Sequence, residues 1–203
     1  MIYEFRTYSL RPGTLPRFLQ LFGDALPKRL RLSPLAAFWH TDTGPLNQVI
    51  HVWPYENGHE RTRIRAEAVK DGSWPPKTGE LITHMRADIF EQMPFSPPLT
   101  PSASGRLVEI CVQTVRPFSL PAMTDLWTTY PSLGLPAETL TGVFVADVGE
   151  LNRWMHVWSY RDLDERDRVK HRLLAAGLWP ARNDAVVIEE ESKLLRPAVF
   201  LSG

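Results

Sequence analysis

The stretch LNQVIHVWPY at residues 46–55 returns as LNRWMHVWSY at residues 151–160. Leucine, asparagine, histidine, valine, tryptophan and tyrosine recur at matching positions, and each lies 105 residues after its counterpart, as 151 does after 46. A fixed offset of this kind indicates an internal repeat, and a repeat constrains the whole architecture. The same offset is therefore expected to relate other parts of the chain.

An offset of 105 aligns the two halves of the chain without a gap. Identical pairs continue on both sides of the motif, among them Glu4/Glu109, Arg11/Arg116, Gly44/Gly149, Arg61/Arg166, Gly72/Gly177 and Trp74/Trp179. The segment PFSPPLTPSASG between the halves has the proline and serine content of an extended linker. We divide the chain into a first repeat at 1–93, a linker at 94–105 and a second, diverged repeat at 106–203.

Each repeat predicts the same order of secondary-structure elements. In the first repeat, alternating residues predict strands at 2–10, 35–42 and 81–90, and the quoted motif is a further strand. Apolar residues at helical spacing predict a helix after the first strand: Leu15, Phe18, Leu19, Phe22 and Leu26. A capping box of Asn57 and Glu60 begins a second helix, which ends near Gly72.

The predicted order is β-α-β-β-α-β, twice. It is typical of the ferredoxin-like α+β unit, in which two helices cover one face of a four-stranded sheet. The other face needs a partner, and the second repeat can supply it. We therefore predict two tandem ferredoxin-like repeats that form a pseudo-dimeric α+β barrel within one chain. The alternative is two independent domains, each of which pairs with another chain, because the linker permits either arrangement.

Side chains alternate across a strand, so each predicted strand has two different faces. Tyr3 and Phe5 are expected between the sheets, whereas Glu4, Arg6 and Tyr8 are expected beneath the helices, together with Asn47, Val49, His51, Trp53 and Tyr55 of the motif. A buried donor or acceptor without a partner costs about 1–3 kcal/mol. These polar groups therefore either satisfy one another in a buried network or line a cavity that holds a ligand.

Composition excludes several classes of protein. Lysine plus arginine and aspartate plus glutamate both number 23, so no basic excess indicates a nucleic-acid surface. Cys111 is the only cysteine, which rules out an intrachain disulfide, and no ligand spacing predicts a metal site. Phosphate-loop and dinucleotide fingerprints are lacking. The chain opens on a strand pattern and carries no apolar run of about 20 residues, so we expect a cytoplasmic protein without a membrane span.

Several stretches resemble the NIPSNAP family: YEFRTYSLRPG (3–13), the pair Phe38-Trp39, GPLNQVIHVWPY (44–55) and the arginine-rich helix that follows. The resemblance covers nearly all of 1–93 and, more weakly, 106–203. It implies the dimeric α+β barrel, whose superfamily includes cofactor-free monooxygenases, haem-degrading enzymes and small-molecule isomerases. The family pattern marks Glu4, Arg6, Tyr8, Trp39, Asn47, His51, Trp53 and Tyr55. Cys111, Gln113 and Phe144 replace three of these in the second repeat, so we expect a working pocket in the first.

Three hypotheses for the function follow. In the first, the protein binds a small, partly aromatic metabolite between the sheet and the helices of the first repeat, in a slot with a cationic end at Arg6. In the second, it is a cofactor-independent monooxygenase or isomerase in which His51 carries protons and Asn47, Arg6 and Tyr55 orient the substrate. In the third, it is a scaffold without a ligand, and the polar face is a satisfied network.

The role of His51 has a structural alternative. A buried histidine can instead hold sheet and helix together through a hydrogen bond to Glu4 or Asn47. No cofactor is expected, and haem at His51 or His84 is suggested only by superfamily analogy. Arg61 and its counterpart Arg166 are expected to pair with the repeated glutamates Glu4 and Glu109. The sequence leaves open whether the two-repeat unit pairs further as a homodimer.

Overall fold

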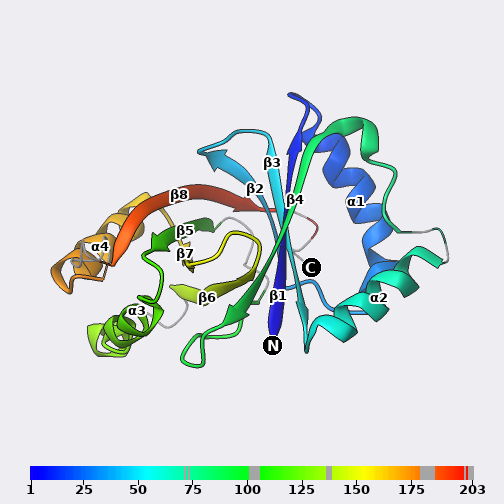
Figure 1. Cartoon of the computed structure of the whole chain (residues 1–203). Coiled ribbons are helices and arrows are strands. Elements are labelled where there is room, and N and C mark those ends of the chain that lie inside the picture. The colour runs from blue at the N-terminus through cyan, green and yellow to red at the C-terminus, as the bar shows by residue number, and fades with distance from the viewer. Residues whose placement is uncertain are drawn as a thin grey trace.

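The computed structural model of the chain has the element order β-α-β-β-α-β twice (Figure 1). It describes residues 1–70, 72, 74–100, 106–135, 139–178, 186–198 and 200. The first repeat contains β1 (Ile2–Leu10), α1 (Leu15–Leu30), β2 (Ala37–Thr43), β3 (Gln48–Tyr55), α2 (Gly58–Lys70) and β4 (Ile82–Gln92). The second repeat contains β5 (Leu107–Val115), α3 (Leu120–Trp127), β6 (Leu140–Val148), β7 (Arg153–Tyr160), α4 (Leu163–Ala175) and β8 (Val187–Pro197).

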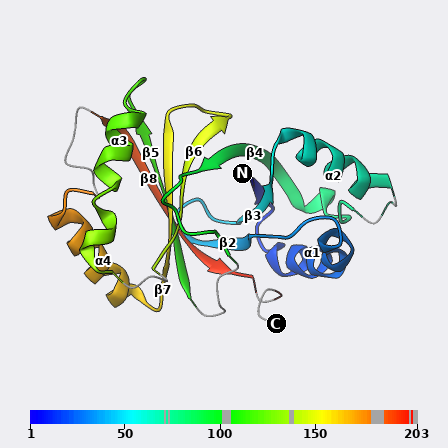
Figure 2. The same cartoon turned by 90° about the horizontal axis from the view of Figure 1, so that it is seen from below.

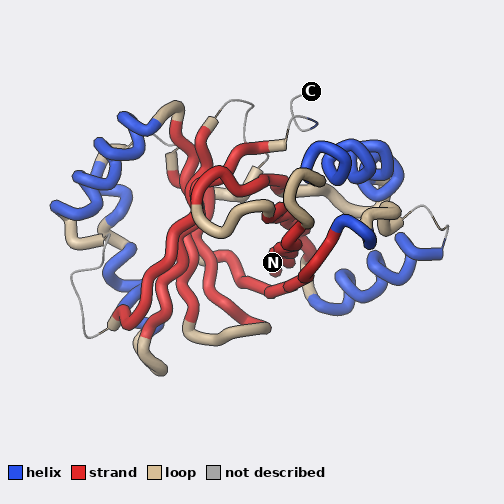
Figure 3. The backbone as a smooth tube through the Cα atoms, turned by 90° about the horizontal axis from the view of Figure 1, so that it is seen from above, coloured by secondary structure: helices blue, strands red, loops and turns tan. Residues whose placement is uncertain are grey.

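The eight strands form one closed antiparallel barrel in the order β1-β3-β2-β8-β5-β7-β6-β4, and β4 pairs back onto β1. The two repeats join at β2–β8 and at β4–β6. Helices α1 and α2 lie outside the barrel on one side, and α3 and α4 lie on the opposite side (Figures 2 and 3). The predicted pseudo-dimeric α+β barrel is therefore confirmed, and the alternative of two independent domains is wrong. None of the helices in the described part of the chain could cross a membrane.

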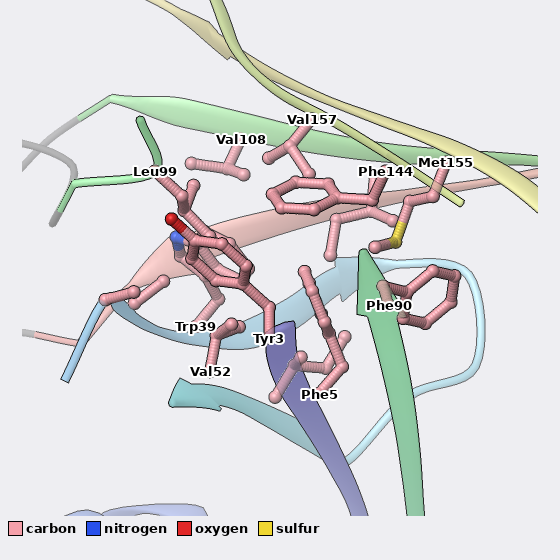
Figure 4. Packing of buried hydrophobic residues seen from close by; sticks show 14 of the residues in the cluster. Tyr3, Phe5, Trp39, Val52, Phe90, Leu99, Val108, Phe144, Met155 and Val157 are labelled. Carbon is pink, nitrogen blue, oxygen red and sulfur yellow. The ribbon is translucent and has the colours of Figure 1, made fainter. Parts of the chain in front are cut away.

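The centre of the barrel interior is apolar, because the residues that point inward there are hydrophobic. Residues of both repeats meet there, and Figure 4 shows Tyr3, Phe5, Trp39, Val52, Val108, Phe144 and Val157 among them. The rings of Tyr3 and Phe5 contact Phe144 edge to face at centroid distances of 5.1 and 5.4 Å. This cluster replaces the interface that two separate chains would otherwise need, and it buries the faces predicted to lie between the sheets.

The local signals for the helices are confirmed. On α1, Phe18, Phe22 and Leu26 are spaced four residues apart and are all buried against the sheet. At the start of α2, Asn57 Oδ1 accepts hydrogen bonds from the backbone N–H of His59 and of Glu60, both at 3.0 Å. These bonds satisfy donors that have no partner within the helix. Asp162 caps α4 in the same way.

Each repeat also sends a short tail across to the other. After β4, Phe95 stacks on Trp154 of the second repeat at 6.3 Å. After β8, Phe200 packs against Phe38 and Phe22 of the first repeat at 5.0 and 6.0 Å. The described part of the predicted linker is not a free spacer, because Leu99 is buried in the barrel core (Figure 4). Residues 101–105 of that linker lie outside the described residues.

Candidate functional site

The quoted motif places a histidine and a tryptophan on the face of β3 that lies beneath α1. Trp53 Nε1 donates a hydrogen bond to His51 Nδ1 at 2.7 Å, and both side chains are buried. The His51 ring stacks on Phe38 at 5.7 Å and meets Tyr8 edge to face at 4.9 Å. The expectation that His51 bonds to Glu4 or Asn47 is therefore wrong, because its partner is the tryptophan two residues along the same strand.

This hydrogen bond fixes where the imidazole proton of His51 lies. An indole nitrogen can only donate, so Nδ1 must accept and cannot carry a proton. The neutral ring then bears its proton on Nε2, which is buried and has no hydrogen-bond partner among the described residues. Burial, followed by the charges of Arg6, Arg29 and Arg65, lowers the pKa of His51 well below its usual range. His51 is therefore a neutral N–H donor around pH 7.

A buried carboxylate lies beside this pair. Glu4 Oε1 accepts hydrogen bonds from Arg6 at 2.9 Å, from Arg61 at 2.7 Å and from Arg65 at 2.9 Å. Burial raises the pKa of Glu4, but the hydrogen bond from Arg61 and the charges of the three arginines outweigh it, so the net pKa is lowered. Glu4 Oε2 is buried and has no partner among the described residues. The predicted Glu4–Arg61 pair is thus confirmed.

The corresponding pair recurs in the second repeat. Arg166 forms two hydrogen bonds with Glu109, at 2.7 and 2.8 Å. Both carboxylates are fully buried beneath the second helix of their own repeat. Trp158 likewise donates to Nδ1 of His156, so the repeated Glu–Arg and His–Trp pairs belong to the framework that both halves share.

Sequence reasoning missed Arg29, which is the most informative residue of the site. It lies at the end of α1, where its guanidinium donates to Ser33 Oγ at 2.7 Å and to the Tyr55 hydroxyl at 3.1 Å. It also stacks over the Trp53 ring at 4.1 Å. Arg29 is only 3% exposed, its pKa is lowered by burial, and no carboxylate in the described part of the chain forms an ion pair with it. Its sequence signal is a charge on the otherwise apolar stripe of α1.

A cavity of about 310 Å³ lies between these residues and the two helices of the first repeat. Six residues predicted from the sequence line it: Glu4, Arg6, Tyr8, His51, Trp53 and Tyr55. The structure adds Arg29 and Arg65, an apolar wall from Phe18 and Phe22, and Trp74 from the segment after α2. The first-repeat pocket, as we call this cavity, is thus an aromatic space with several guanidinium groups in its wall.

Two predicted site residues lie outside the first-repeat pocket. Trp39 points into the barrel interior, and its neighbour Phe38, which pairs in register with His51, takes the place facing α1. Asn47 precedes β3 in a left-handed conformation (φ 57°), as does Asn152 in the second repeat (φ 58°). Asparagine tolerates this conformation better than most residues, so it recurs to make the turn and not to contact a ligand.

Haem does not suit this arrangement. Iron ligation needs a lone pair on the imidazole, but Nδ1 of His51 is occupied by the Trp53 N–H and Nε2 carries the proton. His84 lines a different cavity, at the mouth of the barrel, together with Arg86 and Lys193. Nor do three histidine, cysteine, aspartate or glutamate side chains gather as metal ligands anywhere in the described ranges. The surroundings of His51 therefore do not fit a haem group, and His84 does not face the first-repeat pocket.

A closed eight-stranded antiparallel barrel, built from two β-α-β-β-α-β units with a helix pair on each side, defines a dimeric α+β barrel protein with both units in one chain. The sequence profile of the NIPSNAP family matches residues 3–97 and 108–202. The chain therefore belongs to the NIPSNAP family and carries two tandem copies of its domain.

Known proteins agree with this assignment. The chain is 27% identical over 179 residues to human protein NipSnap homolog 3A, a match that covers 85% of this chain and 72% of that protein. It is 29% identical over 180 residues to mouse protein NipSnap homolog 3B, covering 83% and 71%. Among solved structures, a proposed monooxygenase of Fusobacterium nucleatum superposes with a TM-score of 0.73 over 97% of this chain and 92% of that one, at 12% identity. That likeness concerns the fold alone.

Proposed function

We propose that the protein binds a small, partly aromatic metabolite with a negatively charged group in the first-repeat pocket. The observation that carries the proposal is Arg29, a buried guanidinium that faces an aromatic cavity without a carboxylate partner in the described chain. Removing a cation from water is costly, and an anion that enters the pocket would compensate that cost. A buried guanidinium without a carboxylate partner, in the wall of an aromatic cavity, is typical of a site that binds an anion.

The charges and the size of the pocket support the same ligand class. Among the described residues of the wall, Glu4 is the only carboxylate, and it is shared by three arginines, so positive charge remains in excess. A cavity of roughly 150 Å³ accommodates a benzene ring in another protein, so the larger volume here has room for a substituted ring. Trp53, Phe22 and Trp74 offer faces and edges against which such a ring can pack.

The two alternative functions depend on the same residues. A monooxygenase or isomerase that uses His51 as a base would need a free lone pair on Nε2, where the Trp53 hydrogen bond leaves a proton. A scaffold would need a satisfied polar face, whereas Nε2 of His51 and Oε2 of Glu4 have no partners among the described residues. These observations favour a ligand-binding role over both alternatives.

Calorimetric titration with benzoate tests the proposal, with benzamide as the neutral control. We expect benzoate to bind and benzamide to bind at least tenfold more weakly, which corresponds to about 1.4 kcal/mol. Arg29→Met should reduce benzoate affinity at least tenfold, because the side chain keeps its length and loses its charge. Arg63→Met on the exposed side of α2 is the matched control and should leave the affinity unchanged.

Either of two results would contradict this proposal. Equal affinity for benzoate and benzamide would show that charge plays no part in recognition. Unchanged benzoate affinity in Arg29→Met would place the bound anion elsewhere. Thermal unfolding of the variant distinguishes loss of affinity from loss of fold, because Arg29→Met also removes the hydrogen bonds to Ser33 and Tyr55.

A further inference from the structure

The polar groups in the wall of the first-repeat pocket are nearly all hydrogen-bond donors. The Tyr8 hydroxyl accepts from Arg6 Nε at 2.7 Å, and the Tyr55 hydroxyl accepts from Arg29 at 3.1 Å. Each hydroxyl oxygen is therefore used as an acceptor, and its own hydrogen has no acceptor in the described part of the chain. Together with Nε2–H of His51, these hydrogens give the pocket three donors without partners.

The pocket has little capacity to accept a proton. Arginines hold the pKa of Glu4 below its usual value, although burial opposes them, so this carboxylate is a weak base. Burial raises the pKa of Tyr8 and of Tyr55, and both stay protonated around pH 7. Burial and the neighbouring arginines keep His51 neutral with its proton on Nε2. Donors that face a cavity without a base stabilise a negatively charged oxygen.

We propose that the first-repeat pocket selects a phenol or enol and holds it as the anion, with the charged oxygen accepting a hydrogen bond from His51 Nε2. The proposal deepens the function proposed above and rests on it. On binding, the O–H bond of the ligand breaks, the electron pair stays on oxygen and the proton goes to solvent. The guanidinium groups of Arg6 and Arg29 balance the charge that remains.

Trp53 has a positioning role in this arrangement. Its N–H holds Nδ1 of His51 in the accepting state, which keeps the proton on Nε2. The position of the proton is therefore set before the ligand arrives, and no change of tautomer is needed on binding. Nitrogen-15 NMR of the unliganded protein should show His51 protonated on Nε2 and not on Nδ1 around pH 7. A proton on Nδ1 would overturn the proposal without any variant.

The ligand-bound test uses 4-nitrophenol, whose phenolate absorbs visible light and whose neutral form does not. At a pH below the pKa of the free probe, the wild-type protein should produce the phenolate band. We expect the apparent pKa of the bound probe to fall by about one unit or more, a tenfold preference for the anion. Benzoate should displace the probe, since both occupy the same pocket.

Two substitutions of His51 distinguish a role as hydrogen-bond donor from a role as base. In His51→Gln, the amide oxygen can accept from Trp53 and the NH₂ group can donate to the ligand, so most of the pKa shift should survive. In His51→Leu, the donor is lost and the shift should disappear. His156→Gln changes the counterpart in the second repeat and is the matched control, with the full shift expected. Benzoate binding reports whether each variant keeps its pocket.

The outcomes distinguish this inference from the proposed function. If benzoate binds but 4-nitrophenol stays neutral on the protein, the anion selection is wrong and the binding proposal stands. An equal loss of the shift in His51→Gln and His51→Leu would also overturn the donor role. If neither probe binds the wild-type protein at millimolar concentration, both the binding proposal and this inference fail.

Discussion

The two repeats share a framework and differ in what fills the space beneath their helices. Each has a His–Trp hydrogen bond on its third strand and a buried Glu–Arg pair beside it: Trp53 to His51 and Arg61 to Glu4 in one, Trp158 to His156 and Arg166 to Glu109 in the other. Arg29 lines the first-repeat pocket, whereas its counterpart in the second repeat is Gly134, which has no side chain. The repeated pairs therefore form a framework common to both halves, and Arg29 is a lining residue that the second repeat does not reproduce.

Larger side chains occupy the corresponding space in the second repeat. Trp127 stands where the first repeat has Phe22, and Trp154 stands where it has Val49. Both tryptophans are fully buried, and their ring centroids lie 6.0 Å apart. Trp127 also packs 4.9 Å from the ring of His156. The second repeat therefore uses this volume for core packing, which supports the barrel.

The largest effect is expected from exchanging one residue between the repeats. Leu173 of α4 is fully buried, and its counterpart in α2 is Ala68, which lines the first-repeat pocket. Leu173→Ala should cost about 2–5 kcal/mol because it opens a cavity in a packed core. Ala68→Leu should leave stability within about 1 kcal/mol, because the added methyl groups enter existing space. Urea unfolding measures the free energy of unfolding of both variants. Equal losses of stability would contradict a packed space in the second repeat and an open pocket in the first.

The pH dependence of stability should reflect the buried histidines in both repeats. Burial, followed by the charge of Lys170, lowers the pKa of His156 to about 3, and the pKa of His51 is also well below 6.5. The unfolded chain binds these protons first, so stability is full above pH 6.5 and falls as the pH drops toward the folded-state values. Each histidine should contribute a slope of about 1.4 kcal/mol per pH unit.

Unfolding experiments between pH 7 and pH 5 check this expectation. His51→Gln and His156→Gln should each flatten the dependence by the contribution of one group. A substitution of an exposed histidine, His59→Gln, is the control and should leave the slope unchanged. A slope that is the same in all four proteins would mean that neither buried histidine resists protonation.

A smaller effect is expected where the second repeat supports the first. Phe200 is half-buried against Phe22 and Phe38, and it is not among the residues that line the first-repeat pocket. Phe200→Ala should cost about 1–2 kcal/mol, less than a fully buried phenylalanine. It should weaken benzoate binding less than Arg29→Met does. A loss of affinity as large as that of Arg29→Met would mean that the tail belongs to the site itself.

Much of the fold could be predicted from the sequence because it depends on periodic patterns. The offset of 105 and the alternation in β1 and β3 predicted the barrel and the face that Tyr3 and Phe5 bury in it. The exchanged tails were not predicted, since Phe95 and Phe200 lie in short irregular segments without a period. Their positions depend on contacts between repeats that no local pattern encodes.

The site was predicted less completely, for two physical reasons. The family pattern marks Asn47 and Trp39 as site residues, yet Asn47 recurs because a turn needs its left-handed backbone, and Trp39 belongs to the inward face of β2. Arg29 was missed because it lies on a helix, far in sequence from the motif, where the alternation of side chains along a strand gives no information. A charged residue on an apolar stripe was the available signal.

The most direct test of the difference between the repeats is the stoichiometry of benzoate binding, measured by calorimetric titration of the wild-type protein and of Ala68→Leu. We expect one molecule per wild-type chain and at least tenfold weaker binding when leucine fills the first-repeat pocket as Leu173 fills the second. Two equivalent molecules per chain, or unchanged binding in Ala68→Leu, would contradict the assignment of the site to the first repeat alone.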